Sequence, residues 1–171
     1  MTIAYIGIGS NQGDARAHVL RAFDELARLP GTRLEGRSAL YRSEPVDAPG
    51  QPDYVNAAGG VDTDLTAAQL LAALQDLELR HGRERPTRNA PRTLDLDLLL
   101  YGDTAFASAM LTLPHPRMHQ RAFVLAPLAE IAPSCVIPGR GAVVDLLRSI
   151  DATGVALLET RNSHPETATD R

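Results

Sequence analysis

The order in which strand and helix patterns follow one another constrains the fold of this chain most. Apolar and β-branched runs bounded by turn residues predict strands, and apolar residues repeating every three to four positions predict helices. The first six segments are a strand at 2–8, a helix at 14–29, a strand at 32–42, a strand at 53–62, a helix at 66–81 and a strand at 93–101. This order matches the ferredoxin-like βαββαβ unit, an α+β fold with the sheet on one side and helices on the other.

The two helices have clear sequence limits. Asp14 is a suitable N-cap for the first helix, and Pro30-Gly31 ends it. Thr66 and Gln69 have the spacing of a capping box at the start of the second helix, and Gly82 can terminate it.

C-terminal additions follow the six segments: a helix at 117–131, a short helix at 143–150 and a strand at 155–159. Residues 160–171 contain no core-forming apolar residue, so we expect a disordered tail. Since no repeat or linker divides the rest, we predict one domain over 1–159. The loop at 44–52 holds three prolines, and long loops in compact domains tend to be functional.

Charge and residue usage exclude several classes of function. The net charge of −4 argues against a broad nucleic-acid-binding face. All 17 basic residues are arginine, which excludes P-loop and protein-kinase sites because both need a lysine on the nucleotide phosphates. One cysteine cannot form an internal disulfide, and no apolar run approaches the ~20 residues of a membrane helix. We therefore expect a cytoplasmic protein that binds neither membranes nor nucleic acid. We also expect it to be a monomer.

The run at 93–101 carries the strongest chemical signal. Alternation along a strand sends Leu94, Leu96, Leu98 and Leu100 into the core, while Asp95 and Asp97 share the opposite face about 7 Å apart. Such a pair of carboxylates suits Mg²⁺, which is commonly held by one or two carboxylates together with substrate phosphates. An exposed strand face that merely needs polar residues is the alternative for an isolated pair of this kind.

Arginines just before this strand favour the magnesium interpretation. Five guanidinium groups lie at positions 80, 83, 85, 88 and 92, and only Glu84 interrupts them. Guanidinium groups match phosphate oxygens with paired hydrogen bonds, so arginines beside metal-binding carboxylates form a reasonable polyphosphate site.

Several motifs together resemble the 6-hydroxymethyl-7,8-dihydropterin pyrophosphokinase family of folate biosynthesis. The longest is the run at 88–99, RNAPRTLDLDLL, and four others occur in the family's order: AYIGIGSN at 4–11, QPDYVNAA at 51–58, ELRHGR at 78–83 and LTLPH at 111–115. The resemblance covers about residues 2–135. It implies transfer of the β,γ-pyrophosphoryl group of ATP, as co-substrate, to the pterin's hydroxymethyl oxygen, with release of AMP and with two magnesium ions.

The resemblance also implies roles for individual residues. Metal binding falls on Asp95 and Asp97, and stabilisation of the transferred phosphates on Arg83 and Arg92. The nucleotide side matches Gln75, Arg83, Arg85, Arg88, Arg92, Leu98, Thr112, His115 and Arg121. The pterin side matches Ser43, Glu44, Val46, Tyr54, Asn56 and Phe123. This chain departs from the pattern at Asn89, where some members carry tryptophan, and at Met110, where some carry a basic residue.

Other interpretations of these residues are also open. A nucleotide-sugar transferase also uses an aspartate pair, and a ferredoxin-like regulatory module could hold an anion with its arginines. Gly7, Gly9 and Gly13 superficially resemble a dinucleotide fingerprint, but the third glycine comes one residue late, and we interpret them as permitting a tight turn. His115 and His119 have zinc-ligand spacing, yet Pro116 stands where a metalloprotease needs glutamate.

Overall fold

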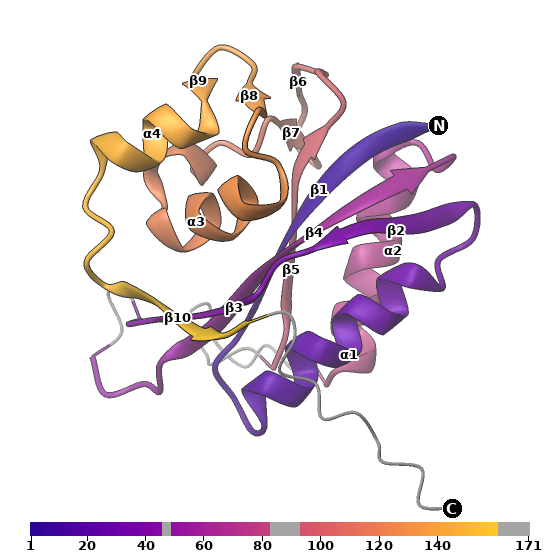
Figure 1. The fold of residues 1–171 in the computed structure, drawn as a ribbon. Helices are drawn as coiled ribbons and strands as arrows, with labels where there is room; N and C mark the ends of the chain where they lie inside the picture. The colour runs from indigo at the N-terminus through magenta and orange to yellow at the C-terminus, as the bar shows by residue number, and fades with distance from the viewer. Residues whose placement is uncertain (46–48, 83–92, 161–171) are drawn as a thin grey trace, which may run out of the picture.

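The computed structural model describes residues 1–45, 49–82 and 93–160. Its helices and strands follow the chain in the order drawn in Figure 1. They are β1 (Thr2–Ser10), α1 (Ala15–Ala27), β2 (Thr32–Arg37), β3 (Leu40–Ser43), β4 (Tyr54–Thr63), α2 (Ala67–Arg80), β5 (Asp95–Tyr101), β6 (Phe106–Ala107), β7 (Thr112–Leu113), the 3₁₀ helix η1 (Met118–Gln120), α3 (Ala122–Ile131), β8 (Val136–Ile137), β9 (Gly141–Ala142), α4 (Val143–Ser149) and β10 (Val155–Glu159).

The main sheet has the strand order β10-β3-β4-β1-β5, and β2 also pairs with β4. Every pair in it is antiparallel. The first and last strands of the βαββαβ unit, β1 and β5, lie side by side, and β1 also pairs with β4, as the ferredoxin-like prediction requires. A nucleotide-sugar transferase would need a doubly wound parallel sheet, so this topology removes that alternative.

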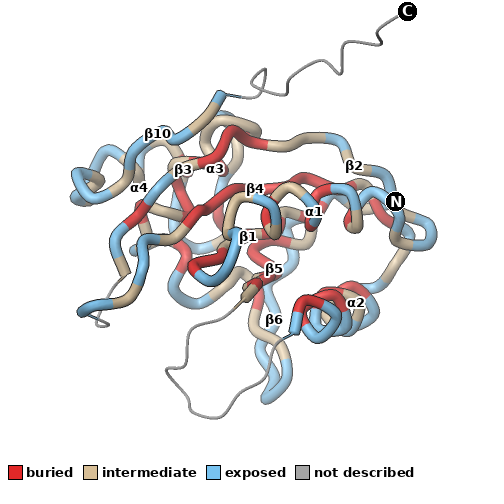
Figure 2. Tube along the Cα trace, turned by 90° about the horizontal axis from the view of Figure 1, so that it is seen from below, coloured by how far each residue is buried: buried red, intermediate tan, exposed pale blue. Residues whose placement is uncertain are grey.

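Helices cover both faces of the sheet (Figure 1). On one face, α1 and α2 bury Phe23, Leu26, Leu70 and Leu74 against the sheet. On the other, the C-terminal helices α3 and α4 form a second apolar cluster that includes Leu128. The predicted arrangement, with helices on one side only, is therefore correct for the βαββαβ unit but incomplete for the whole chain. The buried positions run along β4 and β1, between the two helical layers (Figure 2).

The predicted strand at 32–42 is divided into β2 and β3. At the break, the Ser38 N–H donates to the Ala58 carbonyl at 2.9 Å, and the Ser38 hydroxyl accepts from the Ala58 N–H at 2.8 Å. The Ala39 N–H instead donates to both carboxylate oxygens of Glu130 on α3, each at 3.1 Å. A side chain from another layer thus replaces one strand-to-strand bond, and the sequence pattern of the strand alone gives no sign of it.

A β-bulge corrects one core prediction on β5. Ile6 pairs with Leu98 and Tyr5 with Leu100, so Leu99 is an extra residue in β5. Leu98 packs in the cluster under α1 and α2, whereas Leu100 packs with Leu99 in the cluster under α3. Leu100 is therefore buried as predicted but on the opposite face from Leu98.

The predicted helix limits are confirmed at α1 and α2. The Asp14 carboxylate accepts from the Ala17 N–H at 3.1 Å, and Thr66 and Gln69 form both bonds of the capping box. His81 is the C-cap of α2, and Gly82 follows with a φ of 79°. The predicted helix at 117–131 is instead η1 followed by α3, because Arg121 adopts an extended conformation between them.

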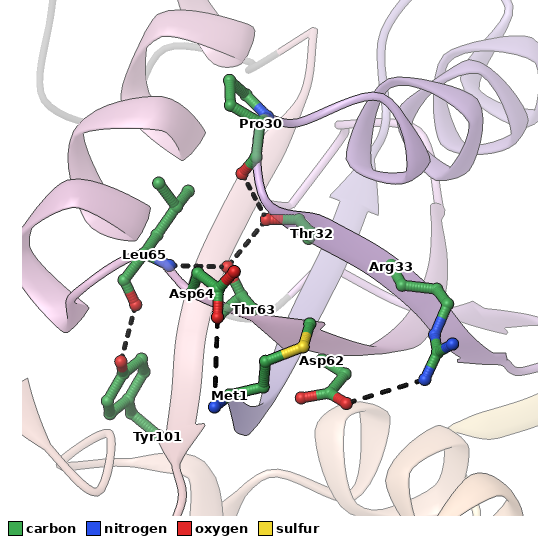
Figure 3. Close-up of polar contacts among 9 residues, drawn as sticks. All are labelled: Met1, Pro30, Thr32, Arg33, Asp62, Thr63, Asp64, Leu65 and Tyr101. Carbon is green, nitrogen blue, oxygen red and sulfur yellow. Dashed lines mark hydrogen bonds and ion pairs between the residues drawn. The ribbon is translucent and has the colours of Figure 1, made fainter.

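Polar side chains tie the strands together at the end of the sheet where β2 begins and β4 ends (Figure 3). The hydroxyls of Thr32 and Thr63 lie 2.7 Å apart, and Thr63 also accepts from the Leu65 N–H at 3.1 Å. The Tyr101 hydroxyl at the end of β5 donates to the Leu65 carbonyl at 2.6 Å. These bonds fix the ends of β2, β4 and β5 relative to one another.

Among the described residues, no helix is both long enough and apolar enough to cross a membrane. The strand β10 is confirmed at its predicted place, where it pairs with β3 at one edge of the sheet. Of the expected tail, residues 161–171 lie outside the described residues, as do residues 46–48 of the proline-rich loop. The assignment of 1–159 to one domain stays a prediction.

Candidate active site

A cleft of about 470 Å³ opens on the face of the sheet that carries α3. Its walls come from β1, β4, β5, the end of β3 and the segment from His115 into α3. Nine of the residues expected at the site line it: Ser43, Glu44, Tyr54, Asn56, Asp95, Asp97, His115, Arg121 and Phe123. They come from positions between 43 and 123 of the chain, and the antiparallel pairing brings them together.

Two glycines form the floor of the cleft. Gly9 pairs with Asp95 on one side and Asn56 on the other, and Gly7 pairs with Asp97 and Ala58. A Cβ at Gly9 would lie 3.5 Å from Asn56 Oδ1, in the space between the aspartates and the β4 side chains. The expectation of a tight turn is wrong for Gly7 and Gly9, which lie within β1. It is correct for Gly13, whose φ is 59°.

Asp95 and Asp97 stand on the cleft face of β5, as the alternation predicts. Both are partly exposed, while Leu94, Leu96 and Leu98 between and beside them are buried. The entrance to the strand is held by the Ser10 hydroxyl, which donates to the Thr93 carbonyl at 2.5 Å. The two carboxylates therefore project from a backbone that is anchored at its start and buried on its other face.

Glu78 is a neighbour of this pair that the sequence placed in a family motif but to which it gave no role. Its side chain on α2 is buried, and its Oε1 accepts from the Leu96 N–H at 3.1 Å. β5 is the edge strand of the sheet, so its outer backbone N–H groups have no neighbouring strand to bond to. The Glu78 carboxylate takes the place of a strand carbonyl for one of them. The sequence does contain a sign of this contact: Glu78 follows Leu77 on the buried face of the helix, where an acidic residue is seldom found without a partner.

The opposite wall of the cleft combines aromatic rings with an amide. The Asn56 amide is buried, and its Nδ2 donates to the Ser43 hydroxyl at 2.7 Å, which fixes the orientation of the amide. Tyr54 lies two residues away on the same face of β4. Phe123 also lines the cleft, and the guanidinium carbon of Arg121 lies 5.6 Å from the centre of its ring. A flat heterocycle with donor and acceptor groups fits such a wall.

His115 brings a neutral imidazole to the rim. The backbone N–H of His115 donates to the Leu99 carbonyl at 2.9 Å. The ring Nδ1 accepts from the Arg117 backbone N–H at 3.2 Å, which leaves Nε2 as the protonated ring nitrogen. Burial lowers the pKa of His115, an effect that nearby Asp97 opposes and that Arg121 and Arg117 reinforce. Arg117, which the sequence reasoning did not select, also lines the cleft.

The other expected residues lie elsewhere. Gln75 is exposed on α2, Leu98 is buried in the core, and Thr112 lies on β7; none of them lines the cleft. Val46, Arg83, Arg85, Arg88 and Arg92 fall outside the described residues. Arg80, the one described member of the arginine cluster at 80–92, lies outside the cleft, and the arginines that line the cleft in the described part of the chain are Arg117 and Arg121.

The donor set suits a hard divalent cation that completes its coordination with a ligand. Within the described ranges, no group of three or more His, Cys, Asp or Glu side chains gathers in a way that could hold a metal by itself. Asp95 and Asp97 offer oxygen ligands on one strand face beside a floor without side chains. Mg²⁺ needs no more from the protein than this, because it usually retains waters and takes further oxygens from substrate phosphates.

The fold and the cleft define a class of protein: a ferredoxin-like α+β protein with two carboxylates facing an aromatic and amide wall, a site for a small ligand. The sequence model of the 7,8-dihydro-6-hydroxymethylpterin-pyrophosphokinase family matches residues 5–133. This chain belongs to that family.

Similar proteins agree with this assignment. The 2-amino-4-hydroxy-6-hydroxymethyldihydropteridine pyrophosphokinase of Pseudomonas aeruginosa is 42% identical over 154 residues, which are 90% of this chain and 95% of that one. The enzyme of the same name from Methylorubrum extorquens is 43% identical over 159 residues, 93% of this chain and all of that one.

Solved structures support the fold. The crystal structure of wild-type Plasmodium falciparum HPPK-DHPS with pteroate aligns with a TM-score of 0.66 at 12% sequence identity. The alignment covers 86% of this chain and 42% of that one, so this chain spans less than half the length of that protein.

Proposed function

We propose that this protein transfers the pyrophosphoryl group of ATP to the hydroxymethyl oxygen of 6-hydroxymethyl-7,8-dihydropterin, in folate biosynthesis. The hydroxymethyl oxygen bonds to the β-phosphorus of ATP, the bond from that phosphorus to the oxygen of the α-phosphate breaks, and AMP leaves. The hydroxyl proton is released. One observation carries the proposal: in a single cleft, a carboxylate pair suited to a nucleotide's magnesium faces a wall suited to a pterin.

The pterin side is assigned to Tyr54, Asn56 and Phe123, with Ser43, Glu44 and Val46 at the rim. The bond from Asn56 to Ser43 supports this, because an amide held in one orientation presents a fixed donor and acceptor edge to the heterocycle. The aromatic rings offer flat apolar surfaces for stacking.

For the nucleotide side, the proposal rests on His115 and Arg121, which line the cleft. The resemblance adds Gln75, Leu98, Thr112, Arg83, Arg85, Arg88 and Arg92, of which the first three lie outside the cleft. Asp95 and Asp97 would hold two magnesium ions with the ATP phosphates, and this metal would neutralise phosphate charge during transfer. Arg83 and Arg92 would stabilise the charge that develops on the transferred phosphates. A neutral His115 can donate a hydrogen bond from Nε2 to the nucleotide.

We further propose that the protein needs two metal ions, acts as a monomer and works in the cytoplasm. Light scattering of the purified protein with and without substrates tests whether it is a monomer. The dependence of the rate on magnesium concentration at saturating ATP tests the number of metal ions, since a second ion adds a second saturation step.

The identity of the nucleotide product tests the function directly. We expect the purified protein, given ATP, Mg²⁺ and hydroxymethyl dihydropterin, to release AMP in a one-to-one ratio with the pterin diphosphate. Omitting the pterin serves as the control for simple ATP hydrolysis. Release of ADP, or of AMP without a pterin product, would contradict the proposal, and binding of ATP without turnover would favour the regulatory-module alternative.

A further inference from the structure

Three titratable side chains join α1 to the C-terminal end of α2, on the face of the sheet away from the cleft. His18 Nδ1 on α1 lies 2.8 Å from His81 Nδ1, and His81 Nε2 lies 2.5 Å from Glu25 Oε1 on α1. The side chain of His81 is 0% exposed, and that of Glu25 is 17% exposed. None of the three residues lines the cleft, so the proposed reaction does not account for them.

The distances restrict where protons can lie. Two Nδ1 atoms at 2.8 Å need one proton between them, because two bare nitrogens or two N–H groups would repel. His81 Nε2 must carry a proton in order to donate to the Glu25 carboxylate. His81 is then either neutral, accepting from His18, or an imidazolium donating to a neutral His18. In both cases the two rings together hold at most one positive charge.

The surrounding charges disfavour a second proton. Arg21 on α1 lies 3.2 Å from Glu25 Oε1 and partly neutralises the carboxylate that would offset the charge. The pKa of His18 is lowered, chiefly by burial and then by His81 and Arg21, with Asp14 and Glu25 acting in the opposite direction. A second proton would place two imidazolium N–H groups face to face, so binding it would require the rings to separate.

A transition metal would be another use for two facing histidines. It would need at least a third ligand, and the described part of the chain brings no further His, Cys, Asp or Glu to these nitrogens in a group able to hold one. The observed separation of 2.8 Å fits a shared proton, since it lies within the distance range of hydrogen bonds donated by N–H groups.

We propose that His18, His81 and Glu25 form a proton-sensitive latch that holds α1 against the end of α2 and opens when both rings become protonated. The position of His81 links the latch to the C-terminal end of α2. As the C-cap of α2 it carries the last helical hydrogen bonds, and Gly82 leaves the helix directly after it. Opening the latch therefore loosens the end of α2 as well as its contact with α1.

The sign of the pH effect follows from His18. Its pKa is lower in the folded than in the unfolded chain, so unfolding takes up a proton when the pH is below about 6.5. Stability from the latch is fully present above that pH and is lost as the pH falls further. For one proton, the unfolding equilibrium constant rises by at most about tenfold per pH unit.

A double-mutant cycle between His18→Asn and His81→Asn isolates the latch. Asparagine places a polar atom near Nδ1 but does not titrate. From chemical denaturation at pH 8, we expect the coupling between the two sites to change the unfolding equilibrium constant about fivefold, and to be smaller at pH 5. His18→Asn alone should flatten the pH dependence of stability and retain more stability at pH 8 than His18→Ala. The control cycle pairs His18 with His119 on η1, across the sheet, and should show no coupling at either pH.

Coupling that is the same at pH 8 and pH 5 would overturn the latch, and so would coupling equal to that of the control cycle. Where His81→Asn fails to fold, ¹⁵N spectra of the imidazole nitrogens in the unmodified protein give the same test. The latch predicts that one Nδ1 of this pair stays unprotonated at pH values below about 6.5, the ordinary pKa of a free imidazole. Independent titration of both rings near pH 6.5, with the fold intact, would refute it. Neither result depends on which reaction the cleft catalyses.

Discussion

Gly9 on the floor of the cleft offers a sharp test of the pterin site. A Cβ at this position would lie 3.5 Å from Asn56 Oδ1 and 3.9 Å from Tyr54 Cδ1, both ordinary contact distances. Gly9→Ala should therefore fold normally, and replacing a strand glycine tends to stabilise a compatible backbone. The new methyl group would nevertheless stand between the β4 side chains and the space that the pterin is proposed to fill.

The expected loss of affinity follows from the interactions at risk. One hydrogen bond to Asn56 is worth about 0.5–1.5 kcal/mol, and stacking on Tyr54 about 1–3 kcal/mol. Their sum, about 1.5–4.5 kcal/mol, corresponds to roughly a tenfold to thousandfold rise in the dissociation constant of the pterin. Gly9→Ala should give the low end of this range, and Gly9→Val, which adds two more methyl groups, the high end.

Calorimetric titration measures the dissociation constant of the pterin for each variant, and thermal unfolding verifies that the variant is folded. Gly36→Ala on β2 is the matched control, because the nearest atom to its Cβ would be Ile131 Cβ at 3.8 Å, outside the cleft. We expect Gly36→Ala to bind pterin as the unmodified protein does. A folded Gly9→Val protein with unchanged pterin affinity would refute the reasoning and move the pterin away from this floor.

Two further predictions concern the aspartate strand and the arginines before it. Glu78→Ala should lower the free energy of unfolding by about 1–3 kcal/mol, because it leaves the buried Leu96 N–H without its acceptor, whereas Glu78→Gln keeps an acceptor and should lose less; equal stability of both variants and the parent in urea would contradict this. Arg92→Ala should lower kcat by on the order of 10³ while changing ATP affinity much less, with partial rescue in Arg92→Lys; an affinity loss as large as the rate loss would make Arg92 a ground-state anchor.

Local patterns predicted those features that local physics determines. The capping box of α2 and the N-cap of α1 depend on side chains within three residues, and both are present. The shared face of Asp95 and Asp97 depends only on the two-residue repeat of a strand. The order of the segments was sufficient for the ferredoxin-like topology, because few arrangements join them with short connections.

Features that depend on contacts between distant segments could not be predicted from local sequence patterns. The bulge at Leu99 is a matter of register between β1 and β5, and an all-leucine stretch carries no sign of it. The break at Ser38 depends on Glu130 from α3, which accepts from Ala39, 91 residues away along the chain. The pairing of His18 with His81 is likewise invisible until the helices are docked.

The aspartate pair carries the central claim, and isosteric replacement tests it most directly. Asp95→Asn and Asp97→Asn keep the shape of each side chain and remove the charge that would hold magnesium. With the fold verified by thermal unfolding, we expect each variant to lose nearly all magnesium-dependent conversion of ATP and hydroxymethyl dihydropterin to AMP and pterin diphosphate. Near-normal turnover in either variant would contradict the assignment of this cleft as the metal-dependent pyrophosphokinase site.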